Sequence, residues 1–182
     1  MEEPWYVTSQ RLWLDYFFWL RFYLTGLITD QSGLSYAASR AFRNASDFAE
    51  FFLPFYGEGV SARLEELFNQ HIQILSEIAT TIRSGQDYSA LRETFYQNAD
   101  DIARFFAEIN PYWDEETWRR LLHARYDVEE ILMWRLYNRD IEGATTLYDY
   151  GYSVVQEIAS YMAEGLARQF QQPLPAGQSP AS

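Results

Sequence analysis

The sequence of 182 residues contains no cysteine and no lysine. Without cysteine, the chain can form no disulfide framework, no zinc ribbon and no thiol nucleophile. All fourteen basic residues are arginine, so a P-loop lysine and Schiff-base chemistry are excluded as well. The sequence also lacks Gly-x-Gly-x-x-Gly, a nucleophile elbow and His-Glu-x-x-His. It therefore has none of the familiar signatures of nucleotide binding, hydrolysis or zinc peptidase chemistry.

Long uninterrupted hydrophobic runs are also lacking. The most apolar stretch, residues 12–28, is broken by Asp15 and Arg21, which is untypical of a membrane-spanning helix. The first four residues lack the basic region of a signal peptide. The formal net charge of −12 argues against nucleic acid or an anionic membrane surface as partner, because both attract Lys and Arg. We therefore expect a cytoplasmic protein with no membrane span and no nucleic-acid partner.

Aromatic side chains, in contrast, are abundant and make up 18% of the residues. Each can bury roughly 150–250 Å² of surface. A chain of this length is typical of one domain, which buries roughly 70% of the surface that the unfolded chain exposes. The sequence thus predicts a single domain at residues 1–170 with an aromatic core. Residues 171–182, rich in Pro, Gly, Ser and Gln, are predicted to be a disordered tail.

Apolar residues recur with helical spacing along most of the chain. In the clearest run the spacing alternates between four and three residues, which places all six side chains on one helical face: Leu64, Phe68, His71, Leu75, Ile78 and Ile82. Segments containing glycine or proline separate such runs. The pattern predicts an all-α fold, an up-and-down bundle of about six helices at residues 9–29, 33–53, 60–84, 87–109, 114–138 and 141–170.

An internal repeat is the most specific feature of the sequence. Residues 44–52 (NASDFAEFF) recur as residues 98–106 (NADDIARFF), an offset of 54. Each copy is followed by a proline-aromatic corner and by another amphipathic helix. The same offset aligns His71 with Arg125. We interpret the second and third predicted helices as a duplicate of the fourth and fifth, flanked by the first and last helices.

Three residues on the predicted seams are candidates for chemistry. A neutral His71 could bind a metal or a proton, but it could equally be a core histidine bonded to a neighbouring helix, and we favour the second interpretation. Arg125 and Glu129 form an i,i+4 pair on the matching seam. Such a pair is costly when buried and ordinary when solvated. We expect it to be solvated.

Other polar residues favour structural roles. Asn44 and Asn98, at equivalent places in the repeat, are expected to make helix–helix hydrogen bonds in the interior. Adjacent acidic residues, of which Glu129 and Glu130 are one pair, point about 100° apart on a helix, so most of these pairs are expected to be solvated. His123 and Asp127 share one helical face but do not by themselves make a metal site. The aromatic segment 13–24 is expected to be central to the bundle rather than a contact surface.

Several motifs in a fixed order resemble a family of small uncharacterised all-helical proteins from spore-forming bacteria. They span about Trp13 to Phe170 and comprise Trp13-x-x-Tyr16-x-x-Trp19-x-Arg21, Pro54-Phe55-Tyr56-Gly57, Gln70-His71, Asn98-Ala99-Asp100-Asp101-Ile102-Ala103, Asn110-Pro111-Tyr112-Trp113 and Gly165-Leu166-x-x-Gln169-Phe170. Some members of that family are labelled acetylglutamate kinase. The sequence gives this label no support, because it has no lysine, no glycine-rich phosphate loop and no alternating strands.

The resemblance implies a ferritin-like or hemerythrin-like bundle, in which family members often carry histidine on the first, third and fifth helices. Such histidines suggest metal binding. Here His71 stands at the third-helix position, Tyr16 at the first, and Ala124 or Arg125 at the fifth. One imidazole does not make a stable metal site. Tyr16, His71, Arg125 and Glu129 are therefore predicted, as an alternative, to form a metal-free polar network in an aromatic core.

Three interpretations of the function follow, and we favour the first. It is a non-catalytic bundle acting through protein–protein interaction or self-association, with a homodimer as the specific expectation, because interfaces favour aromatics over Lys and Glu. The alternative is a metal-binding bundle, with Fe, Mn or Zn held by His71 and neighbouring Glu, Asp or Tyr, and with oxidoreductase activity. A pocket for a small ligand inside the bundle is a third interpretation.

Overall fold

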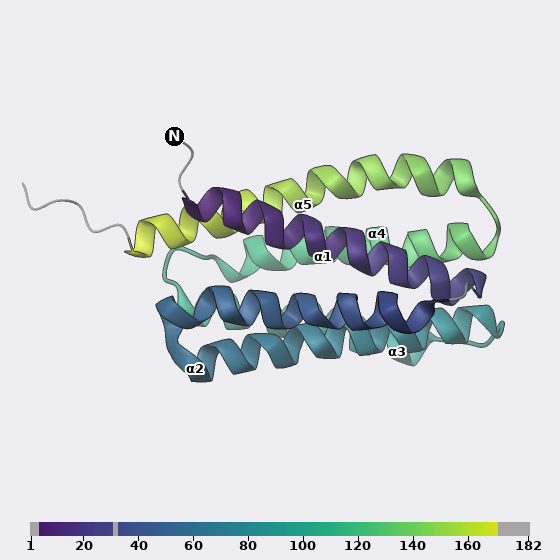
Figure 1. Cartoon of the computed structure of the whole chain (residues 1–182), viewed down its shortest axis with the longest axis horizontal. Coiled ribbons are helices and arrows are strands. Elements are labelled where there is room, and N and C mark those ends of the chain that lie inside the picture. The colour runs from purple at the N-terminus through teal and green to yellow at the C-terminus, as the bar shows by residue number, and fades with distance from the viewer. Residues whose placement is uncertain (1–3, 31–32, 171–182) are drawn as a thin grey trace, which may run out of the picture.

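The computed structural model describes residues 4–30 and 33–170, and within them all regular structure is helical. The five helices are α1 (Pro4–Thr29), α2 (Leu34–Arg83), α3 (Ser89–Ile109), α4 (Glu115–Tyr137) and α5 (Ile141–Phe170). They run lengthwise along an elongated bundle, in which α1 begins and α5 ends at the same end (Figure 1). The all-α prediction is confirmed. The predicted disordered tail at 171–182 lies outside the described residues.

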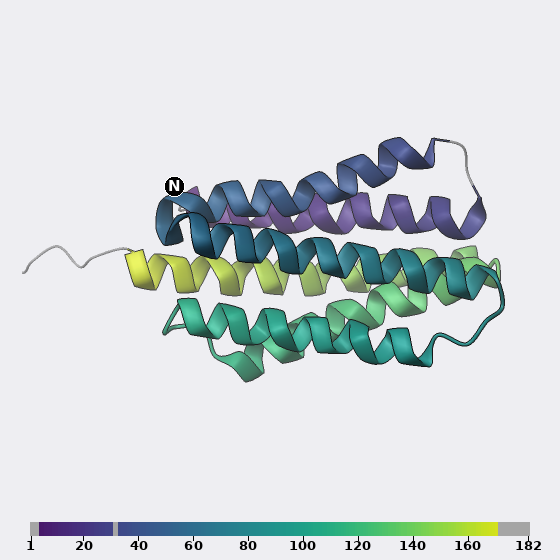
Figure 2. The same cartoon turned by 90° about the horizontal axis from the view of Figure 1, so that it is seen from below.

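The described residues form five continuous helices, and α2 covers two of the six predicted segments as two helical halves that meet at a kink. Helix α2 joins residues 33–53 and 60–84, and its halves lie antiparallel on either side of a sharp reversal (Figure 2). Gly57 makes this reversal with φ 79° and ψ 177°, a region that is essentially restricted to glycine. The helix continues directly after it, and the Ser61 side chain donates from Oγ to the Gly57 carbonyl at 2.9 Å. No loop separates the two segments.

Apart from the predicted ends at residues 53 and 60, which lie inside α2, the helix ends agree with the predictions to within two residues, with one exception. Helix α1 already includes Pro4, the first described residue, well before the predicted residue 9. Proline suits a helix start because its φ is already helical and its missing N–H is not needed there. At the other corner, Asp114 caps α4 by accepting a hydrogen bond from the Thr117 amide at 2.8 Å. These local features decide where the helices begin.

The core runs the length of the bundle and is dominated by aromatic rings. Helix α1 packs against α2 and α5, α4 packs against α3 and α5, and α2 packs against α3. The largest side chains that are fully buried include Trp13, Trp118, Tyr16, Tyr126 and Phe48. Helix α1 also contacts α4 across the bundle. This arrangement brings the seams of α1, α2 and α4 together at one central place.

Candidate functional site, a buried polar network

Four polar side chains meet where α1, α2 and α4 face one another. Tyr16 comes from α1, His71 from the second half of α2, and Arg125 and Glu129 from successive turns of α4. None is more than 3% exposed. The structure therefore brings together the four residues predicted to form a polar network. The expectation that Arg125 and Glu129 are solvated is wrong, because both stand on the face of α4 that packs against α1 and α2.

The imidazole of His71 links two of these side chains. Tyr16 Oη lies 2.6 Å from Nδ1, and Glu129 Oε2 lies 2.9 Å from Nε2. A carboxylate accepts only, so Nε2 carries the hydrogen that His71 donates to Glu129. Nδ1 of the neutral ring is then a free acceptor for the Tyr16 hydroxyl. The result is a directed chain in which Tyr16 donates to His71 and His71 donates to Glu129.

Arg125 balances the charge of Glu129 inside this aromatic enclosure. Its Nη2 lies 2.7 Å from Glu129 Oε1, a close ionic contact without the alignment of a hydrogen bond. The guanidinium carbon lies 4.6 Å from the centroid of the Tyr16 ring and within 6 Å of the Trp13 and Tyr126 rings. Ring faces attract cations. The Arg125 guanidinium thus contacts the Glu129 carboxylate on one side and aromatic rings on the other.

Burial controls the protonation states of Tyr16 and His71. Desolvation raises the pKa of Tyr16 well above its ordinary value, although the positive charge of Arg125 opposes this. Desolvation also lowers the pKa of His71 from its ordinary 6.5, while Glu129 acts in the opposite direction. At neutral pH both groups are therefore uncharged, as the direction of the hydrogen bonds requires.

Asn98 belongs to the surroundings of this network, and Asn44 does not. The Tyr126 ring stacks on His71 with centroids 4.4 Å apart, and its hydroxyl donates to Asn98 Oδ1 at 2.7 Å. Asn98 Nδ2 donates to the Leu67 carbonyl of α2 at 3.1 Å, the expected helix–helix hydrogen bond. The same expectation is wrong for Asn44, whose Oδ1 accepts from Arg40 of its own helix and whose Nδ2 has no partner among the described residues.

The residues around His71 do not fit a metal centre. Both imidazole nitrogens already have hydrogen-bond partners. The positively charged Arg125 already contacts Glu129 Oε1, an oxygen that a metal ion bound here would need as a ligand. Across residues 4–30 and 33–170, no group of three or more His, Asp or Glu side chains lies close enough to hold a metal ion. The predicted metal ligand His71 is therefore part of a hydrogen-bonded chain in this structure.

His123 and Asp127 turn to helix α3 rather than toward each other. His123 Nε2 lies 2.8 Å from Asp100 Oδ1, and Asp127 accepts from the Tyr96 hydroxyl at 2.5 Å. Their neighbour Glu130 accepts from Tyr88 and Arg92, also of the α3 side. These groups tie α3 to α4 at the surface of the bundle.

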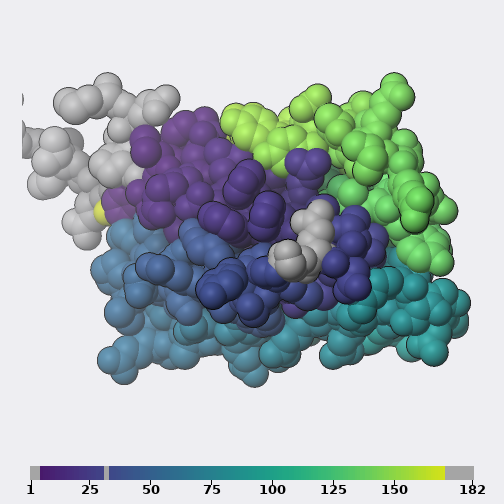
Figure 3. All heavy atoms as spheres, turned by 45° about the vertical axis from the view of Figure 1, so that its right-hand side comes forward, coloured from purple at the N-terminus to yellow at the C-terminus, as the bar shows by residue number. Residues whose placement is uncertain are grey.

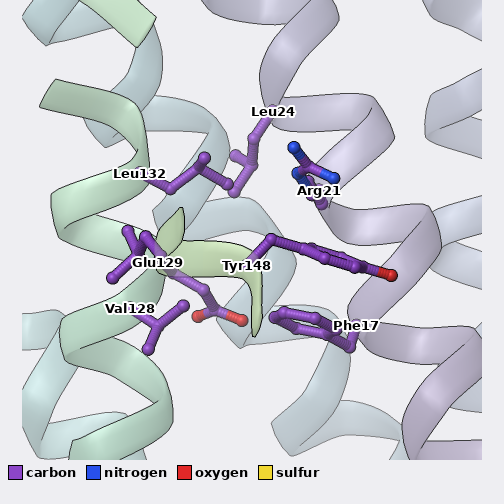
Figure 4. Close-up of a pocket in the computed structure, with 8 residues that line it drawn as sticks. Phe17, Arg21, Leu24, Val128, Glu129, Leu132 and Tyr148 are labelled. Carbon is purple, nitrogen blue, oxygen red and sulfur yellow. The ribbon is translucent and has the colours of Figure 1, made fainter. Parts of the chain in front are cut away.

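A small cavity opens beside Glu129, between α1, α4 and α5. Its volume is about 10 Å³, close to the smallest space that holds one water molecule. Figure 4 shows the Glu129 carboxylate pointing toward the stacked rings of Phe17 and Tyr148, with Arg21 above Tyr148. The two rings stack with centroids 5.1 Å apart. The cavity at this place is therefore too small for the predicted small ligand and has room for about one water molecule.

Sequence reasoning did not identify the aromatic partners of the network. Trp13, Tyr126 and Phe95 enclose Arg125 and His71, and none of them belonged to the predicted site. One signal was present, because Tyr126, Glu129 and Met133 share a helical face spaced by three and four residues. With so many aromatic residues in the chain, this spacing could not distinguish site residues from ordinary core.

The aromatic segment 13–24 is only partly central to the bundle. Trp13, Tyr16 and Leu20 are buried, whereas Phe18 is 50% and Phe22 55% exposed. These two phenylalanines, with Arg21 and Thr25, line a hollow of about 250 Å³, which we call the α1 face. Figure 3 shows α1 lying open at the surface between α2 and α5. The expectation that this segment is buried rather than a contact surface is thus wrong for Phe18 and Phe22.

Comparisons with known proteins add no relative. No family model matches the chain, no curated protein matches it, and no solved structure matches it. Over the residues that the structure describes, none of the helices is both long and apolar enough to cross a membrane.

Proposed function

We propose that the protein acts through self-association, as a homodimer that two copies form by packing their α1 faces together. The observation that carries the proposal is the pair Phe18 and Phe22, which are half exposed one turn apart on the same side of α1. Adjacent exposed aromatics are typical of contact sites, because scattered single apolar residues are the norm elsewhere on a surface. In this proposal the role of the protein is binding rather than catalysis.

The charge distribution along α1 supports a second copy as the occupant. Between Tyr16 and Thr29 the only charged residue is Arg21, although the whole chain carries a formal charge of −12. The centres of interfaces are depleted of charged residues and enriched in aromatics and Arg. An antiparallel pair of α1 helices related by a two-fold axis would place each Phe18 near the partner's Phe22, an isologous contact. The acidic surface elsewhere would then remain in solvent.

The test is the mass of the protein in solution. We expect size-exclusion chromatography with light scattering to give the wild type a mass near that of two 21.5-kDa chains. Replacing both aromatics, Phe18→Ser with Phe22→Ser, should lower the mass to that of one chain, because the apolar contact is lost. Tyr112→Ser is the matched control, since Tyr112 is similarly exposed (44%) but lies in the corner before α4. A wild type that stays monomeric at high concentration would contradict the proposal.

The proposal extends to the origin and location of the chain. We infer that residues 33–84 and 87–138 are duplicates. The matched pairs Asn44 with Asn98 and His71 with Arg125 support this, because all four residues are buried. The resemblance to the helical family of spore-forming bacteria remains a hypothesis. So does a cytoplasmic location, which the lack of cysteine supports.

A further inference from the structure

Self-association does not account for the hydrogen-bonded pair of Tyr16 and His71 in the core. The Tyr16 hydroxyl is fully buried and lies 2.6 Å from His71 Nδ1, a nitrogen with a free lone pair. Other buried tyrosines meet groups that cannot take up a proton. Tyr126 donates to the amide oxygen of Asn98, and the hydroxyl of Tyr23 accepts from Ser76. Tyr16 is thus a phenol whose nearest hydrogen-bond acceptor is a base, His71 Nδ1 at 2.6 Å, while the Phe68 carbonyl lies farther away at 3.4 Å.

The surroundings of Tyr16 favour loss of its electron together with its proton. The phenol stays protonated in the resting protein, because burial opposes formation of a phenolate. Removing an electron alone would leave a positively charged ring only 4.6 Å from the guanidinium of Arg125, and like charges repel strongly in an interior of low dielectric. Moving the proton to His71 removes this charge from the ring. The imidazolium that forms lies against the Glu129 carboxylate at 2.9 Å.

We propose that Tyr16 is a redox-active tyrosine that loses one electron to a soluble one-electron oxidant while its hydroxyl proton moves to His71 Nδ1. The O–H bond of Tyr16 breaks, an N–H bond forms on His71, and the oxidant is reduced by one electron. The products are a neutral tyrosyl radical and an imidazolium paired with Glu129. When an electron returns, the proton moves back from Nδ1 to Oη and the resting state is restored.

A chain of aromatic rings connects Tyr16 to the surface. The Tyr16 ring lies 6.3 Å from Trp13, and Trp13 lies 6.4 Å from Trp118, measured between centroids. Trp118 lies 5.2 Å from Tyr161, a partly exposed residue of α5. Among side chains that contain no sulfur, tryptophan and tyrosine are the most easily oxidised by loss of one electron. These rings therefore form a series of sites through which an electron can pass from the buried phenol to an oxidant in solvent.

The same enclosure would protect the radical once it forms. Phe68 stacks on Tyr16 with centroids 5.3 Å apart and nearly parallel planes, and Phe48 meets it edge-on at 6.0 Å. These phenylalanine rings keep solvent away from the phenol oxygen. The radical at Tyr16 should consequently outlive radicals formed at exposed tyrosines.

The test is electron paramagnetic resonance on the full chain after photo-oxidation. Ruthenium tris-bipyridine with persulfate supplies the one-electron oxidant, and the samples are frozen at increasing delays after the flash. We expect a long-lived neutral tyrosyl signal in the wild type. The signal should narrow when the protein is grown with ring-deuterated tyrosine, and it should show a coupled proton that exchanges in D₂O. A long-lived signal with tryptophan character, or one without an exchangeable coupled proton, would overturn the proposal.

Three variants locate the radical and its base. Tyr16→Phe should abolish the long-lived signal, whereas Tyr126→Phe, the buried control whose hydroxyl faces an amide, should keep it. His71→Gln retains a hydrogen-bonding side chain that cannot accept the proton, so it should also abolish the signal, with folding verified by circular dichroism. If His71→Gln does not fold, the exchangeable coupling in the wild type decides the role of His71. Survival of the signal in folded Tyr16→Phe would refute the assignment.

Discussion

At the scale of single residues, the ion pair of Arg125 and Glu129 shows that a buried charge depends on its partner. Two ions in a protein interior lose most of their hydration, and their mutual attraction only roughly compensates for that loss. The rings of Trp13 and Tyr16 offset part of the remaining cost for Arg125. Removing one charge should therefore be far more harmful than removing both.

Glu129→Gln should lower the free energy of unfolding by about 3–5 kcal/mol, because it leaves the Arg125 guanidinium buried without a counter-charge. The measurement is urea denaturation followed by circular dichroism. The double replacement Arg125→Met with Glu129→Leu should unfold closer to the wild type than the single variant does. If Glu129→Gln lowers the free energy of unfolding by less than about 1 kcal/mol, the pair behaves like a solvated ion pair. That result would contradict the burial described above.

The stability of the protein should also depend on His71 through pH. Burial lowers the pKa of His71 below its ordinary 6.5, so below this pH the unfolded chain binds a proton that the folded chain does not. The free energy of unfolding should then fall as pH decreases below 6.5, by at most about 1.4 kcal/mol per pH unit. Urea denaturation of wild type and His71→Gln between pH 7.5 and 5.5 measures this, and the difference between them isolates His71. An equal pH dependence of both would contradict the prediction.

At the scale of elements, close approach of α5 to its neighbours depends on glycine. A Cβ atom on Gly165 would overlap the indole of Trp113, and that indole donates from Nε1 to the Tyr161 carbonyl at 3.2 Å. Gly165 thus lets α5 lie directly against the corner before α4. The hydrogen bond between the corner and the helix is possible only at this short separation.

Gly165→Ala should reduce the free energy of unfolding by about 1–3 kcal/mol, the usual cost of forcing extra atoms into a packed core. Gly59→Ala is the matched control, because nothing lies within 4 Å of a Cβ at that helical position. The control should gain about 0.5–1 kcal/mol from the lower flexibility of the unfolded chain. Thermal unfolding measures the melting temperatures of both variants. Equal melting temperatures would contradict the prediction, because they would show that the Trp113 side chain moves aside at no cost.

At the scale of the whole molecule, net charge opposes the proposed homodimer. Two copies that each carry −12 repel one another, and salt screens that repulsion. The dissociation constant should therefore decrease as NaCl is raised from about 0.01 to about 1 M, over which the Debye length falls from about 30 to about 3 Å. Analytical ultracentrifugation would measure it. Dissociation at high salt would instead indicate an interface held by ion pairs, which the α1 face does not supply.

The sequence by itself determined the fold class and most helix ends, because helical spacing and capping residues act over a few neighbouring positions. It also placed Tyr16, His71, Arg125 and Glu129 in one predicted network, through the repeat and the resemblance. It did not determine the path at Gly57, since proline and two glycines there are equally compatible with a loop.

Only the tertiary structure decided the burial and the contacts of the site. Arg125 and Glu129 form an i,i+4 pair in either environment, and the packing of α1 and α2 against α4 excludes water from it. Asn44 and Asn98 are equivalent in sequence, yet only Asn98 finds a neighbouring helix to bond. Likewise, Phe17 is buried and Phe18 is half exposed, because a helix turns about 100° per residue and the packing of α1 leaves Phe18 on its outer side.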